Sequence, residues 1–136
     1  MPSAVPTPAS LLESARALLN RSVAPYSRFR VAALLEDGDS AIHPGVNVES
    51  ASYGLSICAE RNALFGALAR GASRFRRLAL VSETMRPVLP CGACRQVLLE
   101  HAPDLRLVLE RADGSPEELR LAELLPRPFT EFRAQP

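Results

Sequence analysis

The sequence predicts an α/β fold, a three-layer sandwich in which helices cover both faces of a mixed β-sheet of about five strands. Two observations predict it: the chain opens with a helix and a hairpin, and helical and strand patterns then alternate. With 136 residues, the chain is long enough for one hydrophobic core and too short for two. Apolar residues make up 47% and charged residues 23%, a composition typical of a folded globular domain.

The first helix is expected to begin at Ser10. Ser10 and Glu13 have the spacing of a capping box, in which each side chain accepts a hydrogen bond from the other residue's backbone N–H. Pro25 lies beyond the expected end of the helix. The apolar residues that recur at helical period are Leu11, Leu12, Ala15, Leu18 and Leu19.

A hairpin follows the first helix. The apolar run Val31–Leu35 predicts a strand, and the turn residues 36–39 lead into a second strand that is expected to end at Gly45–Glu49. Because strand side chains alternate between the two faces, Asn47 and Glu49 are predicted to share one face. From the residues alone, the simplest interpretation of this pair is two solvated strand side chains.

Residues 58–70 are good helix formers, and Gly71 is suited to end that helix. The apolar stripe of this helix is predicted to consist of Leu64, Phe65, Ala67 and Leu68. A buried strand is expected at Leu78–Val81, after three arginines that we interpret as a solvated face.

A third helix is expected from Cys91 to about His101, where Pro103 prevents it from continuing. Leu105–Leu109 is then predicted to be a strand, and the turn at residues 112–114 leads into a last short strand.

The charge balance and the residue types exclude several classes of function. A net charge of +1 disfavours binding to a polynucleotide, and no apolar run is long enough to span a membrane. All sixteen basic residues are Arg, so chemistry that needs a lysine amine is excluded. Three cysteines in a chain without a signal-peptide pattern indicate reduced thiols and a cytoplasmic protein rather than a disulfide framework.

The three cysteines lie at the predicted N-termini of two helices. Cys91 and Cys94 are three residues apart, which brings their Cβ atoms within about 5–6 Å on a helical turn. Cys58 begins the other helix, and partial positive charge at a helix N-terminus favours the thiolate that binds metal. Three protein ligands leave the fourth position of a zinc ion for water. Residues 58 and 60 would point about 200° apart on an ideal helix, so Glu60 can lie beside that water only if Cys58 is not itself helical. Taken alone, the Cys91–Cys94 pair is also compatible with a redox dithiol, half of a structural zinc site, or two buried thiols.

Together these segments resemble the cytidine deaminase family, in its small homotetrameric three-cysteine form. Two segments are similar to the family's zinc motifs, at residues 58–63 (CAERNA) and 90–97 (PCGACRQV). The segments 24–29 (APYSRF), 45–49 (GVNVE) and 51–54 (ASYG) resemble its substrate-binding parts, and 123–126 (ELLP) with Phe129 its C-terminal end. The similarity runs from about residue 10 to residue 132, so we expect one domain there, a flexible Pro-rich tail at residues 1–9 and a second tail at 133–136.

The resemblance implies hydrolytic deamination of free cytidine and deoxycytidine in pyrimidine salvage, by a zinc-activated water. It makes Cys58, Cys91 and Cys94 the ligands of one Zn²⁺ per chain, Glu60 the proton shuttle and Arg61 a donor to the thiolates. Phe29 is then expected to stack on the pyrimidine, Asn47 and Glu49 to bind the ribose 3′-hydroxyl, and the Ala59 backbone to contact the base. By the same analogy, the neighbouring subunits of a homotetramer contribute Ala51, Tyr53 and Phe129.

A carboxylate facing the ribose 3′-oxygen would repel a phosphodiester, so a free nucleoside is favoured over nucleic acid. Two positions depart from the family pattern: Ala32, where Gly is usual, and Ser50, where Asn is common. His43 and His101 match no motif and are expected at the surface or at helix ends.

Three alternatives remain open at this point. One is a deaminase of a related aminopyrimidine nucleoside such as blasticidin S. The second is a non-catalytic interaction protein stabilised by zinc, which would need a fourth protein ligand. The third is a thiol–disulfide redox protein that uses Cys91 and Cys94.

Overall fold

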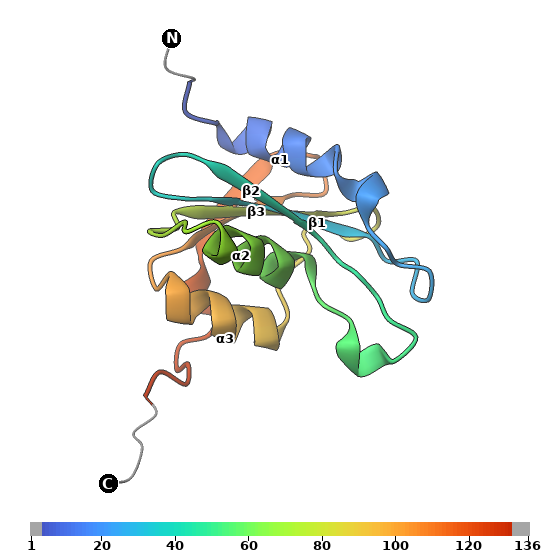
Figure 1. The fold of residues 1–136 in the computed structure, drawn as a ribbon. Coiled ribbons are helices and arrows are strands. Elements are labelled where there is room, and N and C mark those ends of the chain that lie inside the picture. The colour runs from blue at the N-terminus through green and yellow to red at the C-terminus, as the bar shows by residue number, and fades with distance from the viewer. Residues whose placement is uncertain (1–3, 132–136) are drawn as a thin grey trace, which may run out of the picture.

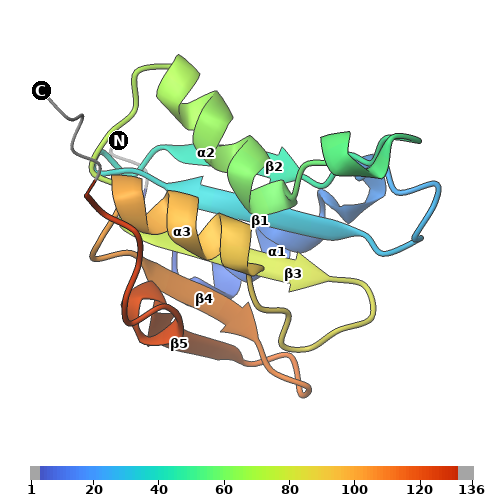
Figure 2. The ribbon, with the colours of Figure 1, turned by 90° about the horizontal axis from the view of Figure 1, so that it is seen from below.

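The computed structural model describes residues 4–131. Its five strands form one mixed sheet in the order β2-β1-β3-β4-β5 (Figures 1 and 2). β1 pairs antiparallel with both β2 and β3, β3 and β4 run parallel, and β4 pairs antiparallel with β5. The strands are β1 (Val31–Glu36), β2 (Ile42–Val46), β3 (Arg77–Ser82), β4 (Arg106–Glu110) and β5 (Pro116–Arg120). The helices are α1 (Pro8–Arg16), α2 (Ala59–Ala69) and α3 (Gly92–His101), with 3₁₀ turns at Leu19–Arg21, Tyr53–Leu55 and Leu121–Leu124.

The helices lie on both faces of this sheet. α1 covers one face, whereas α2 and α3 lie side by side on the other (Figures 1 and 2). Strand side chains alternate between two cores for this reason: Ala33 and Leu35 point toward α2 and α3, and Ala32 and Leu34 toward α1. The predicted three-layer α/β/α sandwich with a mixed five-stranded sheet is therefore confirmed.

The predicted start of the first helix is wrong by two residues. α1 begins at Pro8, and Thr7 is its N-cap: the Thr7 hydroxyl accepts from Ser10 N at 3.1 Å, and the Ser10 hydroxyl accepts from Thr7 N at 2.9 Å. Pro8 favours this earlier start, since its fixed φ suits the first helical position. Residues 8 and 9, which we had assigned to a tail, are thus helical, and the tail at 133–136 lies outside the described residues.

Two further expectations change in detail. The regular part of the second strand ends at Val46, and beyond it Val48 forms isolated bridges with Val23 and Ile57. In α2 the buried stripe consists of Ala59, Glu60, Ala63, Leu64 and Ala67. Phe65 and Leu68, which we had placed in that stripe, are exposed. Gly71 does end the helix, with φ +82°, as Gly71 N and Ala72 N donate to the carbonyl oxygens of Leu68 and Ala67.

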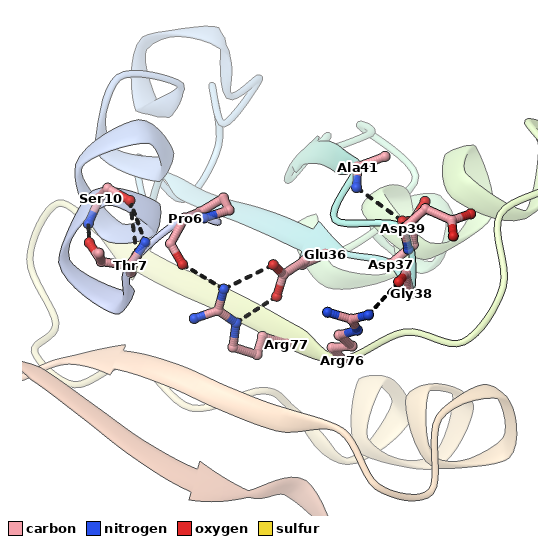
Figure 3. A network of polar contacts seen from close by, with 10 residues as sticks. All are labelled: Pro6, Thr7, Ser10, Glu36, Asp37, Gly38, Asp39, Ala41, Arg76 and Arg77. Carbon is pink, nitrogen blue, oxygen red and sulfur yellow. Dashed lines mark hydrogen bonds and ion pairs between the residues drawn. The ribbon is translucent and has the colours of Figure 1, made fainter. Parts of the chain in front are cut away.

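Ion pairs join the end of β1 to its neighbours (Figure 3). The buried Glu36 carboxylate accepts from Arg77 Nε at 2.5 Å and Nη2 at 2.9 Å, and Arg77 Nη2 also donates to Pro6 O at 2.7 Å. Arg77 thereby connects the segment before α1 to β1 and β3. Our interpretation of Arg77 as part of a solvated face is therefore wrong. Arg74 and Arg76 are exposed, as expected, although they contact Asp39 and the Gly38 carbonyl.

His43 is buried, with 7% of its surface exposed, so its predicted surface position is wrong. Its Nε2 lies 2.8 Å from the Asp37 carboxylate, and Arg70 donates to its Nδ1 at 3.2–3.3 Å. Since Arg70 only donates, Nδ1 accepts and Nε2 carries the hydrogen. His101 ends α3 and is exposed, as expected. Within residues 4–131, no helix has the length and apolar character needed to cross a membrane.

The Asp37 carboxylate stabilises the turn of the β1–β2 hairpin through its hydrogen bonds. Its pKa lies below the usual value because His43 donates to it, assisted by the backbone N–H groups of Asp39 and Ala41 and opposed by burial. A lowered pKa means that the folded state prefers the ionised form. We expect Asp37→Asn to destabilise the protein by about 1–3 kcal/mol near neutral pH.

That difference should remain down to about pH 5 and shrink below about pH 4, because Asp37 of the unfolded chain takes up its proton there first and the folded protein does so only at lower pH. Urea unfolding of both proteins from pH 3 to pH 7 measures it. A difference that stayed constant across this whole range would contradict the role given to the Asp37 charge.

Candidate active site

The three cysteines converge at one place on the α2–α3 face of the sheet. Cys58 is the N-cap of α2 and Cys91 the N-cap of α3, and Cys94 lies buried in the first turn of α3. The Cys58 and Cys91 sulfur atoms are 3.8 Å apart, and all three sulfur atoms lie within 4.8 Å of one another. All three thiols are free. Two helix N-termini therefore point their partial positive charge at one cluster of sulfur atoms.

Charged and polar neighbours stabilise a thiolate in this cluster. The pKa of Cys58 is lowered because Cys94 donates a hydrogen bond to it and because Arg61 lies beside it, with Nη2 3.5 Å from Sγ. The same contact with Cys58, together with burial, raises the pKa of Cys94. Arg61 Nε is buried and has no hydrogen-bond partner in the described part of the chain. This N–H is therefore an unused hydrogen-bond donor on the residue that contacts the Cys58 thiolate.

Glu60 is the second residue of α2 and only 4% exposed. Its pKa is raised to about 7, chiefly by burial and in addition by the charge of Cys58, although its own backbone N–H, Cys94 and Arg61 act in the opposite direction. The Cys58 backbone is extended, with φ −70° and ψ 155°. This is the non-helical entry that the sequence required for Cys58 and Glu60 to serve one site.

The position of α2 depends on a close approach to β2. A Cβ on Gly45 would lie 2.9 Å from the Ala63 Cα, and closer still to the Ala59 carbonyl oxygen and the Ala63 nitrogen. Asn62 Nδ2 donates to Val46 O at 2.8 Å across the same contact. Gly45 was part of a recognised segment, but its role was not predicted. A lone glycine inside a strand pattern is the signal that indicates such an approach.

The position of the Cys91 loop depends on Arg95, another residue without a predicted role. Its Nε donates to Pro90 O at 2.8 Å, directly before Cys91, and its Nη1 donates to Leu124 O at 3.1 Å. Arg95 thus connects the start of α3 to the C-terminal segment. No local pattern in the sequence predicts a contact between residues 29 positions apart.

Asn47 holds the backbone around Phe29. Its Nδ2 donates to Phe29 O at 2.7 Å, and its Oδ1 accepts from Val31 N at 2.9 Å and from the Ser22 hydroxyl. Phe29 is half-buried and packs against the core under α2 and α3. One Nδ2 hydrogen of Asn47 remains for a ligand, because the amide carries two.

Glu49 holds the turn that precedes Phe29. Its Oε1 accepts from the backbone nitrogens of Tyr26 and Ser27, each at 3.1 Å, and its Oε2 accepts from the Ser27 hydroxyl. These contacts lower the pKa of Glu49, chiefly through the Ser27 hydroxyl. Asn47 and Glu49 therefore both turn toward residues 22–31, although the regular strand ends before them.

The side chains expected from neighbouring subunits do not all gather here. Tyr53 is 73% exposed, with its ring 5.8 Å from that of Tyr26, and both line a cavity of about 300 Å³ beside Glu49. Phe129 is 65% exposed and lies against α3, where its backbone bonds to the Gln96 side chain. Ala51 is exposed, whereas Ala59 is fully buried at the start of α2. A larger cavity of about 580 Å³ near Pro25 and Glu83 does not include the thiols.

A three-layer sandwich that presents three thiols at two helix N-termini beside a buried carboxylate defines a zinc-dependent hydrolytic enzyme. Comparison with known proteins supports this class. The family described as "Cytidine and deoxycytidylate deaminase zinc-binding region" matches residues 7–109. The chain therefore belongs to the cytidine deaminase family, as its motifs predict.

Individual relatives agree with this assignment. A cytidine deaminase of Halalkalibacterium halodurans is 49% identical over 107 residues, which are 78% of this chain and 81% of that protein. The crystal structure of cytidine deaminase from Burkholderia pseudomallei has a TM-score of 0.85 at 46% identity, over 91% of this chain and all of that one. The cytidine deaminase structure from Mycobacterium tuberculosis has a TM-score of 0.77 at 37% identity, over 89% and 95% of the two chains.

Gly45 offers a direct test of how the site is positioned. Gly45→Ala should push β2 away from α2, lower the free energy of unfolding by about 1–3 kcal/mol and weaken metal binding at the thiols. Gly66→Ala, on the helix α2 that Gly45 contacts, is the matched control, since its Cβ would meet only the flexible end of Arg70. That change should stabilise the helix by about 0.5–1 kcal/mol. Urea unfolding and zinc content of both variants measure the effects, and equal stability of the two would refute the close approach.

Proposed function

We propose that the protein hydrolyses free cytidine and deoxycytidine to uridine and deoxyuridine, with release of ammonia, as a step of pyrimidine salvage. The observation that carries this proposal is the cluster of three thiols within 4.8 Å of one another, beside the buried carboxylate of Glu60. A structural zinc site has no use for this carboxylate, and a redox pair needs only two of the three thiols. The cytidine deaminase relatives support the same choice of substrate.

Cys58, Cys91 and Cys94 would hold one Zn²⁺ per chain. Two thiolates bound to a tetrahedral zinc ion at about 2.3 Å lie a little under 4 Å apart, and Cys58 and Cys91 are 3.8 Å apart. The buried Nε of Arg61 has no hydrogen-bond partner in the described residues, which suits a site where zinc keeps all three thiols deprotonated. When bound, zinc supplies a Lewis acid that makes water nucleophilic near neutral pH.

Glu60 would move the protons of the hydrolysis. Its carboxylate accepts the proton that the attacking water loses and passes it to N3 of the pyrimidine. The second proton of that water then goes from the hydroxyl added at C4 through Glu60 to the 4-amino group, which leaves as ammonia while the C4 carbonyl of the product forms. Burial of Glu60 keeps bulk water from exchanging with the proton it carries.

The segment around Phe29 would bind the nucleoside. Phe29 stacks on the pyrimidine, the Ala59 backbone contacts the base, and Asn47 and Glu49 bind the ribose 3′-hydroxyl. The free Nδ2 hydrogen of Asn47 and the ionised carboxylate of Glu49 suit a hydroxyl, which both donates and accepts. A phosphodiester at that oxygen would be repelled by Glu49, so the substrate is a free nucleoside and not DNA or RNA.

We also propose a cytoplasmic homotetramer in which each active site is completed by neighbouring subunits. One chain leaves Tyr53 and Phe129 largely exposed, and Phe129 contacts α3 away from its own Phe29 segment. Ala51, Tyr53 and Phe129 would therefore act in the sites of other copies. The three free thiols suit a reducing compartment.

Glu60→Gln tests the proposed mechanism. The amide keeps the size of the side chain but cannot accept and release a proton, so turnover of cytidine should fall by about 10²–10⁴-fold. Zinc content should stay at one ion per chain, and Glu13→Gln, on the exposed face of α1, should leave both unchanged. Ammonia release and metal analysis measure the two quantities. Robust activity of Glu60→Gln would disprove the mechanism.

Subunit mixing tests the shared site. Glu60→Gln and Phe129→Ala chains should each have low activity alone, whereas tetramers formed by co-expression should recover up to about a quarter of wild-type activity, since some sites then combine two intact contributions. Sedimentation velocity confirms the tetramer in the same samples. A mixture no more active than its two parents would rule out sharing of Phe129.

A further inference from the structure

Ser27 lies between two groups to which we have assigned substrate contacts. Its hydroxyl donates to Glu49 Oε2 and accepts from Phe29 N at 3.0 Å, and its backbone N–H donates to Glu49 Oε1 at 3.1 Å. The side chain thus links the Glu49 carboxylate, in the segment after β2, with the backbone of the aromatic residue. We assigned no role to it from the sequence.

The direction of these hydrogen bonds is unambiguous. An ionised carboxylate only accepts and a backbone nitrogen only donates, so the single hydroxyl hydrogen must point at Glu49. The lowered pKa of Glu49 means that this carboxylate is ionised near neutral pH. Ser27 therefore cannot reverse its orientation without losing both partners.

The contacts of Glu49 leave little freedom for a ligand. A carboxylate has about four acceptor positions, and three are used here: two on Oε1 by backbone nitrogens and one on Oε2 by Ser27. The remaining position lies on Oε2, beside the bond from Ser27. The Ser27 hydroxyl therefore determines where on Oε2 a further hydroxyl can donate.

Phe29 depends on the same hydroxyl. Its nitrogen is held by Ser27 and its carbonyl by Asn47, so the residue is fixed on both sides. Arg28, between Ser27 and Phe29, has φ +56°, a conformation that costs energy for a residue with a side chain. The hydrogen bonds from Ser27 and Asn47 to the Phe29 backbone hold this turn. A displaced Glu49 would free the Ser27 hydroxyl and weaken the first of these bonds.

We propose that Ser27 is a positioning residue that aligns the Glu49 carboxylate with a ribose hydroxyl and the Phe29 backbone with the base. The proposal rests on the proposed function, because it assumes that Glu49 and Phe29 contact a nucleoside. Ser27 itself touches neither the metal ligands nor the atoms that react.

Ser27→Ala, assayed with two substrates, tests this role. With cytidine, we expect kcat/KM to fall about tenfold, chiefly through a higher KM, because a hydrogen bond to a charged group is lost. With 2′,3′-dideoxycytidine, which lacks the 3′-hydroxyl, the fall should be about threefold or less, because only the Phe29 contact matters. The preference of the enzyme for cytidine over the dideoxy substrate should therefore decrease.

Two matched variants control for a general loss of structure. Ser27→Thr keeps a hydroxyl and should retain most of the wild-type preference. Ser115→Ala removes another hydrogen bond from a serine hydroxyl to a carboxylate, that of Asp113 in the exposed turn before β5, and should change neither substrate's kcat/KM. Zinc content and urea unfolding of each variant show whether the protein is intact.

A double-mutant cycle tests whether Ser27 acts through Glu49. In a Glu49→Ala background, adding Ser27→Ala should reduce cytidine turnover no more than it reduces dideoxycytidine turnover. Equal losses with both substrates in the single variant, or no loss at all, would overturn the role of Ser27 while leaving the proposed function intact. A folded, zinc-loaded wild-type protein that does not deaminate cytidine would overturn both.

Discussion

The three sulfur atoms lie within 4.8 Å of one another, and thiolates this close repel one another unless positive charge surrounds them. The fold supplies that charge from the N-termini of α2 and α3 and from the Arg61 guanidinium. Two helix N-termini meet only if the helices lie side by side on one face of the sheet, as α2 and α3 do. The arrangement of the layers is therefore a condition for the site.

That condition depends on contacts well away from the sulfur atoms. Gly45 lets the β2 backbone reach α2, and Arg95 ties the loop before α3 to the C-terminal segment. Neither residue is among the proposed substrate contacts. Both determine where a helix begins in space, and a shift of either helix would separate Cys58 from Cys91.

The elements and the cluster of three thiols could be predicted because their signals are local. Helical and strand periods identified every helix and strand of the sheet to within a few residues, and the Cys58, Cys91 and Cys94 segments carried the zinc motifs. Long-range partners were out of reach. His43 was misplaced because its burial depends on Asp37 and Arg70, and Phe65 because the stripe of α2 turns toward β2 at Gly45.

Asn47 and Glu49 show why a site residue and a structural residue need not be different things. Both were expected to face a ribose, and both already hold the chain segment that carries Phe29. These bonds join groups of one chain, so they fix the polar groups and the aromatic ring relative to one another. Binding of the proposed nucleoside would therefore cost less free energy for the ordering of protein side chains. The same bonds make the segment sensitive to substitution. A change at Asn47 or Glu49 would alter the proposed contact with the ribose hydroxyl and the proposed stacking of Phe29 together.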